Sequence, residues 1–185
     1  MKKAIYIFIF FISQYFFGQQ SNQLWKGYFS YNEIVDVESS TNAVFASTQN
    51  ALFSQVVASS NLNVYNSITG LKPDVITTIH HSDAFNKTFV GNNNGLILIQ
   101  NADGSVTTKV DVIEEVPVPP NKKKINDFFE FNGRLYIATD YGISVIDIAT
   151  SEFISTYFIG TSGEETEVLQ TTVFNNEIYA VTRSF

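Results

Sequence analysis

The sequence predicts an all-β protein, a β-propeller with about three full blades plus a partial fourth, so that the ring is incomplete. One motif, two β-rich segments around a tight polar turn, recurs along the chain and opens each time at an aromatic residue: Phe45, Phe89, Tyr136 and Tyr179. These residues are 44, 47 and 43 positions apart, which is the period of a four-stranded blade. A β-sandwich would also give short strands, but it provides no reason for one motif to recur at the same phase.

Each period divides into the four strands of a blade. The third period is the clearest, because residues 125–131 and 135–139 flank Asn132-Gly133, a dipeptide suited to a type I′ hairpin turn. Its remaining strands are predicted at 143–148 and 153–158. The same division gives strands 34–37, 44–48, 52–57 and 62–65 in the first period, and 75–80, 88–91, 96–100 and 106–110 in the second.

The connections carry three further expectations. Residues 101–104 are predicted to form a hairpin turn rather than a calcium loop, because further carboxylates at alternating positions are missing. Residues 114–124, rich in proline and lysine, are expected to form a longer solvated connection. Ala51 stands where the later copies have glycine, so the first hairpin turn is expected to differ in geometry.

The first eighteen residues are predicted to be a signal peptide. Lys2 and Lys3 precede an apolar run at 4–17, and those fourteen residues are too short for a comfortable membrane span. An uncleaved interfacial anchor is the alternative. We therefore expect residues 1–18 to be removed and residues 19–185, the N-terminal part of a truncated propeller, to be exported to the periplasm or outer-membrane surface without a transmembrane segment.

Composition excludes several classes of function. After the leader, nine basic residues face eighteen acidic ones, and such an acidic chain without a basic stripe argues against nucleic acid as a partner. The chain has no cysteine, so it has neither a disulfide framework nor a thiol nucleophile.

The chain shows no catalytic signature. His80, His81, Ser82 and Asp83 have the residue types of a catalytic triad, but neighbours on an extended chain point to opposite faces and cannot form a relay. The same geometry argues against a metal site, because no third ligand is evident. We predict no catalytic residue, no metal ligand and no cofactor, and hence a protein that is not an enzyme.

No ligand-binding residue is assigned from the sequence. The acidic run at 164–167 is interpreted as a solvated loop rather than a cation site. Trp25 or Tyr141, if exposed, would offer a ring for stacking on a sugar. Most other aromatic residues alternate within strands, as Phe128 and Tyr179 do, and are expected between packed blades.

The blade motif resembles a known repeat. Residues 135–147 are similar to the two-component-regulator propeller repeat, in which an aromatic residue, an apolar pair and Thr precede a Gly and an apolar residue. More widely, the chain from 24 to 182 resembles the PorZ-like N-terminal propellers of the Bacteroidetes type IX secretion system. The segments that carry this resemblance are 25–34, 69–71, 94–97, 124–126 and 152–160.

The resemblance implies a non-enzymatic scaffold of the secretion system's attachment complex, which assists the delivery of lipopolysaccharide to the cargo sortase. Its implied partners are other secretion-system proteins of the sortase complex, together with lipopolysaccharide or glycan. The alternative is a periplasmic glycan-sensing propeller of a hybrid two-component regulator, which shares the repeat. A propeller lyase or glycosidase needs convergent acids or histidines that the sequence does not show.

The ring is not expected to close. Residues 25–30 precede the first inner strand as 153–158 precede the fourth, so they are predicted to be the outermost strand of a final blade whose other strands this chain lacks. Because ring closure is what protects the strand edges of a propeller, we expect an open arc with unpaired edges.

Overall fold

The computed structural model describes residues 31–59, 61–72, 74–116 and 118–183. The predicted leader at 1–18 and the predicted outermost strand at 25–30 lie outside these residues. Both therefore stay predictions.

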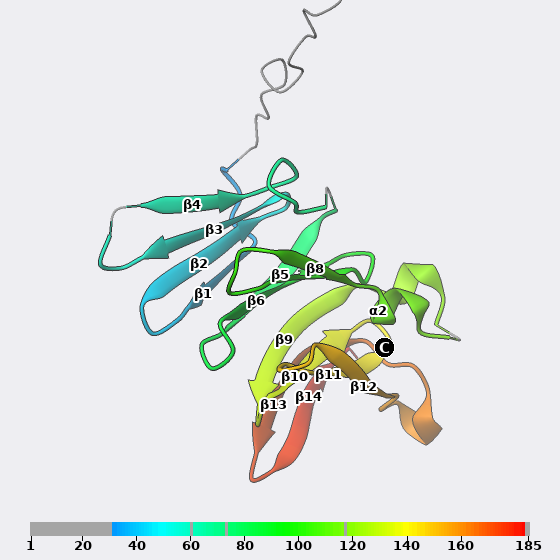
Figure 1. Cartoon of the computed structure of the whole chain (residues 1–185). Coiled ribbons are helices and arrows are strands. Elements are labelled where there is room, and N and C mark those ends of the chain that lie inside the picture. The colour runs from blue at the N-terminus through cyan, green and yellow to red at the C-terminus, as the bar shows by residue number, and fades with distance from the viewer. Residues whose placement is uncertain (1–30, 60, 73, 117, 184–185) are drawn as a thin grey trace, which may run out of the picture.

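The described chain forms four antiparallel sheets, each made of consecutive strands. Blade 1 contains β1 (Asp36–Ser39), β2 (Ala43–Thr48), β3 (Ala51–Val56) and β4 (Leu62–Tyr65). Blade 2 contains β5 (Ile76–Ser82), β6 (Lys87–Asn92), β7 (Ile97–Gln100) and β8 (Val106–Lys109). Blade 3 contains β9 (Ile125–Phe131), β10 (Arg134–Thr139), β11 (Gly142–Asp147) and β12 (Glu152–Tyr157), and blade 4 contains β13 (Val168–Phe174) and β14 (Glu177–Thr182). The blades follow one another as a fan from blue to red (Figure 1).

The predicted fold class is confirmed: three four-stranded blades and a two-stranded fourth form an incomplete propeller. The four aromatic residues that open the repeats all lie on the second strand of their blade. The largest difference at a strand's start is at the first strand, predicted at 34–37 and found at Asp36–Ser39. Its register with β2 begins at Asp36, whose carboxylate is bound by blade 2. The backbone N–H of Val35 already donates to the carbonyl oxygen of Ser47 on β2, but the side chains of Ile34 and Val35 remain exposed.

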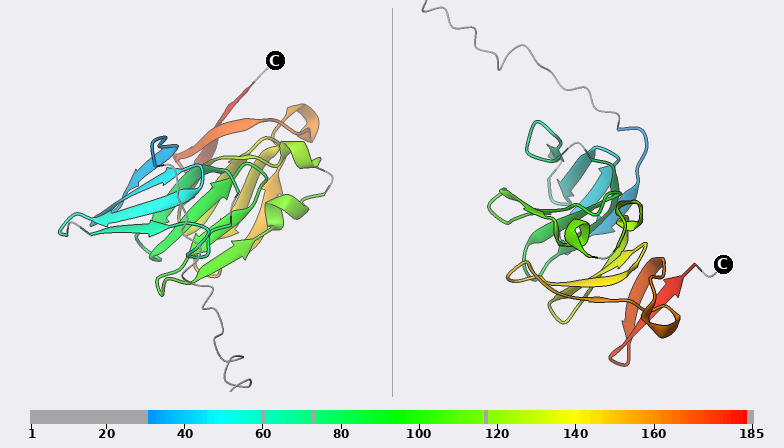
Figure 2. Two further views of the ribbon diagram at one scale, coloured as in Figure 1. Left: turned by 90° about the horizontal axis from the view of Figure 1, so that it is seen from above. Right: turned by 90° about the vertical axis from the view of Figure 1, so that its right-hand side faces the viewer.

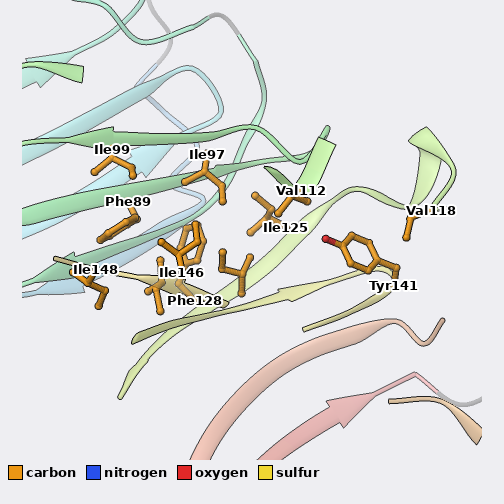
Figure 3. Close-up of a cluster of buried hydrophobic side chains, with 12 residues drawn as sticks. Phe89, Ile97, Ile99, Val112, Val118, Ile125, Phe128, Tyr141, Ile146 and Ile148 are labelled. Carbon is orange, nitrogen blue, oxygen red and sulfur yellow. The ribbon is translucent and has the colours of Figure 1, made fainter. Parts of the chain in front are cut away.

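Three apolar clusters fill the spaces between successive blades. One lies between blades 1 and 2, one between blades 2 and 3 (Figure 3), and one between blades 3 and 4. Strand β7 shows why consecutive apolar residues are needed: Leu98 belongs to the first cluster, while Ile97 and Ile99 belong to the second. Alternate side chains of a strand point to opposite faces, so an interior blade is apolar on both.

The two ends of the arc leave apolar side chains in contact with solvent. On blade 1, Val37 is 59% exposed on the face opposite the buried Phe45. On blade 4, Ala180 packs against the third cluster, so the neighbouring Tyr179 points away and is 48% exposed. The expectation that Tyr179 lies between packed blades is therefore wrong, whereas Phe128 is buried as expected. Figure 2 shows blades 1 and 4 at opposite ends of the molecule.

The connection between blades 2 and 3 differs from the solvated loop expected at 114–124. It begins with α2 (Asp111–Glu114) and contains the short 3-10 helix η3 (Pro120–Lys122). Val112, Val118 and Lys123 are buried there, because the segment folds over the end of the cluster between blades 2 and 3. Figure 3 shows Val112 and Val118 at this end and Ile148 at the other.

The turns match their predicted chemistry. Asn132 and Gly133 have φ values of 50° and 72°, in the left-handed region that a type I′ turn requires. Residues 101–104 form the turn between β7 and β8, where Asp103 accepts hydrogen bonds from the backbone N–H and Oγ of Ser105. Ala51 opens β3 without a positive φ, whereas Gly142 at the equivalent place has a φ of 155°.

Candidate functional site: the inner strands and the loop face

The first strand of each blade contacts the first strand of the next, so that β1, β5, β9 and β13 form a continuous inner layer. Acidic side chains join these strands. The Oδ2 atom of Asp36 accepts the backbone N–H of Ile79 at 2.8 Å and the hydroxyl of Thr78 at 3.0 Å. The Oε2 atom of Glu38 accepts the backbone N–H of His81 at 2.8 Å. These carboxylates are therefore structural acceptors that align blade 1 with blade 2.

Asp127 on β9 is the corresponding carboxylate between blades 3 and 4, and the backbone of Thr171 on β13 lies near it. Burial raises the pKa of the Asp127 carboxyl to about 6, although hydrogen bonds from the backbone of Thr171 and Phe128 act in the opposite direction. The nearby charge of Asp36 adds to the increase. This carboxyl thus titrates much closer to neutral pH than an ordinary aspartate.

His80 lies where three inner strands meet. Its Nδ1 atom is 2.8 Å from Oε1 of Glu38 on β1, and its Nε2 atom is 3.0 Å from Oε2 of Glu130 on β9. Burial lowers the pKa of His80, but the hydrogen bonds and charges of Glu38 and Glu130 outweigh this effect and raise the pKa above 6.5. The sequence offers no signal for this arrangement, since the three residues are far apart along the chain.

The neighbouring triad-type residues have different surroundings. The ring of His81 stacks on Phe45 with a centroid separation of 4.2 Å, and burial lowers the pKa of His81. Among the described residues, the buried Ser82 Oγ has no hydrogen-bond partner, and Asp83 accepts both the N–H and the hydroxyl of Thr41. The two ring nitrogens of His80, by contrast, lie at hydrogen-bond distance from carboxylates of the adjacent blades. His81 Nε2 lies 3.7 Å from Asp83 Oδ1, but Ser82 Oγ bonds to neither histidine, so the four residues are not arranged as a relay.

The loop face is formed by the connections between blades and the β10–β11 turn. Tyr141 in that turn is fully buried, and its hydroxyl lies 2.7 Å from Ser144 Oγ. It therefore offers no exposed ring for stacking on a sugar, and Trp25 lies outside the described residues. The buried Lys123 places its ammonium 5.6 Å from the centre of the Tyr141 ring and donates to the carbonyl oxygen of Glu115.

The acidic run at 164–167 is paired with basic side chains. Lys122 Nζ lies 2.9 Å from Glu165 Oε2, and Arg183 Nη1 lies 3.3 Å from Glu167 Oε1. These four residues line a cavity of about 290 Å³ together with Asp140 and Thr166. Both signs of charge meet in this cavity, so it suits a polar partner that both donates and accepts hydrogen bonds.

The part of the chain that the structure describes contains no group of three or more His, Cys, Asp or Glu side chains positioned to hold a metal ion. Across the same residues, no helix has the length and apolar character needed to cross a membrane.

Comparison with known proteins identifies the repeat. Residues 44–184 match the family model described as the N-terminal β-propeller domain of PorZ of the type IX secretion system. No curated protein sequence shows significant similarity to the chain.

Several solved structures share the fold. PorZ from Porphyromonas gingivalis, described as an essential bacterial surface component of that system, aligns with a TM-score of 0.72 at 19% identity. That alignment covers 85% of this chain and 20% of PorZ. The extracellular domain assigned to the hybrid two-component system BT3049 of B. thetaiotaomicron aligns with a TM-score of 0.61 at 18% identity, over 82% of this chain and 19% of that one.

Virginiamycin B lyase from Staphylococcus aureus aligns less well, with a TM-score of 0.57 at 12% identity over 73% of this chain and 45% of the lyase. At these identities the structural matches establish the propeller fold alone. The chain spans about a fifth of the length of the PorZ structure that it matches.

Proposed function

This chain belongs to the family of PorZ N-terminal β-propeller domains, and from that membership we propose that it is a non-enzymatic scaffold of the type IX secretion system. In this proposal it acts in the attachment complex at the cell surface, where it assists the delivery of lipopolysaccharide to the cargo sortase. The observation that carries the proposal is the family match over 44–184, which includes parts of all four blades.

Several acidic side chains are engaged in contacts within the protein, which supports the role of a scaffold. The inner-strand carboxylates of Asp36 and Glu38 are hydrogen-bonded to the next blade, and Glu165 and Glu167 are paired with basic residues. Rigid blades with loops gathered at their ends allow recognition to vary without changing the core. The cavity beside Asp140 is one place on the loop face where a secretion-system partner or the sugar part of lipopolysaccharide would bind.

Export is part of the same proposal. We propose that residues 1–18 are a cleaved signal peptide and that the protein acts in the periplasm or on the outer-membrane surface. Intact mass of the exported protein should correspond to a chain that starts at or near Gln19. A periplasmic species that retains residues 1–18 would contradict cleavage.

Deletion of the complete gene tests the function. We expect secreted cargo to remain inside the cell, or to be released without its lipid anchor. Restoring the gene should restore anchoring, and a variant with Asp140 and Glu165 changed to Asn and Gln should do so less well if the loop-face cavity takes part.

A second function is favoured by one observation, the similarity in fold to the extracellular domain assigned to a hybrid two-component system. In that case the propeller senses a glycan fragment in the periplasm. The same deletion distinguishes the two functions: intact cargo anchoring with loss of transcription of a neighbouring glycan-utilisation locus would select the sensor.

A further inference from the structure

The His80 ring contacts two carboxylates at once, and this has a consequence for its protonation. A neutral imidazole carries one N–H and one acceptor nitrogen. Here both nitrogens lie at hydrogen-bond distance from carboxylate oxygens, 2.8 Å to Glu38 and 3.0 Å to Glu130. Because an ionised carboxylate only accepts hydrogen bonds, both contacts are satisfied only when the ring is doubly protonated or a carboxyl group is protonated.

The surroundings of the ring favour a bound proton. Its side chain is 14% exposed, so solvent replaces few of its contacts. The titratable groups on or beside the strands packed around it are Asp36 and Glu38 on β1, His81 on β5 with Asp83 just after that strand, Lys87 on β6, and Asp127 and Glu130 on β9. Four of these seven are carboxyl groups on the two neighbouring inner strands, and the ammonium of Lys87 is held by the carbonyl oxygens of Ile148 and Ala149 on blade 3. Burial lowers the pKa of His81, so as the pH rises His81 loses its proton before His80 does.

We propose that His80 is a proton-dependent joint, in which an imidazolium on blade 2 bridges Glu38 of blade 1 and Glu130 of blade 3. Loss of the proton leaves one carboxylate facing a nitrogen lone pair, and the three inner strands β1, β5 and β9 then pack less tightly.

The joint adds to other contacts between the blades that do not depend on the charge of His80. Thr77 Oγ1 donates to the carbonyl oxygen of Ile125 at 2.6 Å, which connects blades 2 and 3 whatever the charge of His80. Glu38 also keeps its bond from the backbone N–H of His81. Glu130 has no such second bond among the described residues, so removal of the proton should loosen the arc without separating its blades.

The direction of the pH effect follows from the raised pKa. A histidine whose pKa is higher in the folded than in the unfolded state stabilises the fold fully below the unfolded value, and the stabilisation disappears as the pH rises through the folded value. The joint is therefore closed at mildly acidic pH, and it opens as the pH rises through a pKa that lies above 6.5.

Nuclear magnetic resonance of the full chain tests the proposal, because the sequence has only two histidines. A pH titration of their ring signals, assigned with His81→Gln, should give a pKa above 6.5 for His80 and below 6.5 for His81. Glu130→Gln should lower the pKa of His80, and the exposed Glu152→Gln is the control that should leave it unchanged.

Stability supplies a second measurement. Between about pH 6 and about pH 8.5, the wild-type melting temperature should fall relative to that of Glu130→Gln, whose joint lacks one carboxylate. A His80 pKa at or below 6.5 in the wild-type chain would overturn the proposal, even if the variant failed to fold. An unchanged His80 pKa in folded Glu130→Gln would overturn it as well.

Discussion

The carboxylate of Asp36 on blade 1 accepts the backbone N–H of Ile79 on blade 2 at 2.8 Å, across 43 residues of chain. Glu38 and His81 form the same kind of link at the same separation. The sequence separation of these pairs is close to the period of the repeat. The acidic residues of the inner strands therefore fix the stagger of one blade on the next.

Replacing Asp36 should destabilise the fold. Asp36→Ala leaves the backbone N–H of Ile79 and the hydroxyl of Thr78 without their acceptor, and such a loss costs about 1–3 kcal/mol of unfolding free energy. Asp36→Asn keeps one acceptor oxygen and should cost less. Urea unfolding measures both, with the exposed Glu33→Ala as the control; equal effects of the two Ala variants would contradict the role of Asp36.

Lys87 should also contribute strongly to the unfolding free energy, because its ammonium reaches from blade 2 to the β11–β12 turn of blade 3. It donates to the carbonyl oxygens of Ile148 and Ala149 and to Ser151 Oγ, at 2.7, 2.8 and 2.9 Å. Lys87→Met keeps most of the apolar stem and removes the three donors, so we expect a loss of roughly 1–3 kcal/mol. The exposed Lys72→Met should change the unfolding free energy by less than about 0.5 kcal/mol.

Gly142 and Ala51 occupy equivalent turn positions, but substitutions at the two positions should cost different amounts of unfolding free energy. A methyl group at Gly142, where φ is 155°, would collide with the backbone carbonyl of Tyr157, so Gly142→Ala should cost more than about 1 kcal/mol. Ala51 has no positive φ, and Ala51→Gly should cost only about 0.5–1 kcal/mol through chain entropy. Thermal unfolding of both variants compares them; a Gly142→Ala variant as stable as the wild type would contradict the strained turn.

Asp127→Asn should change how stability depends on pH. The pKa of Asp127 is raised from 3.8 to about 6 in the fold, so the carboxyl favours folding below pH 3.8 and loses this contribution as the pH rises towards 6 and beyond. The melting temperature of Asp127→Asn relative to wild type should therefore be higher at about pH 7.5 than at about pH 4.

Asp103→Asn is the matched control for Asp127→Asn. Hydrogen bonds from Ser105 lower the pKa of the exposed Asp103 below 3.8, so the melting temperature of Asp103→Asn relative to wild type should be nearly the same at about pH 4 and about pH 7.5. If the relative melting temperature of Asp103→Asn changed with pH as that of Asp127→Asn does, the burial of Asp127 would not explain the pH dependence of its variant.

The sequence by itself determined the blade architecture. The recurrence of an aromatic residue and a tight turn at one phase located the second and third strands, and Asn132-Gly133 specified its turn, because these signals depend on residues that are near neighbours in the chain. The start of β1 was misplaced by two residues, since the carboxylate contacts of Asp36 with blade 2 are not local.

Only the tertiary structure decided which side chains meet between blades. Glu38, His80 and Glu130 come together because three inner strands pack side by side; the period places them on neighbouring blades, but it does not show that their side chains meet. The exposure of Tyr179 and the burial of Tyr141 were decided in the same way. A period identifies the blade to which a residue belongs, but the packing of neighbouring blades determines whether its side chain is covered, charged or paired.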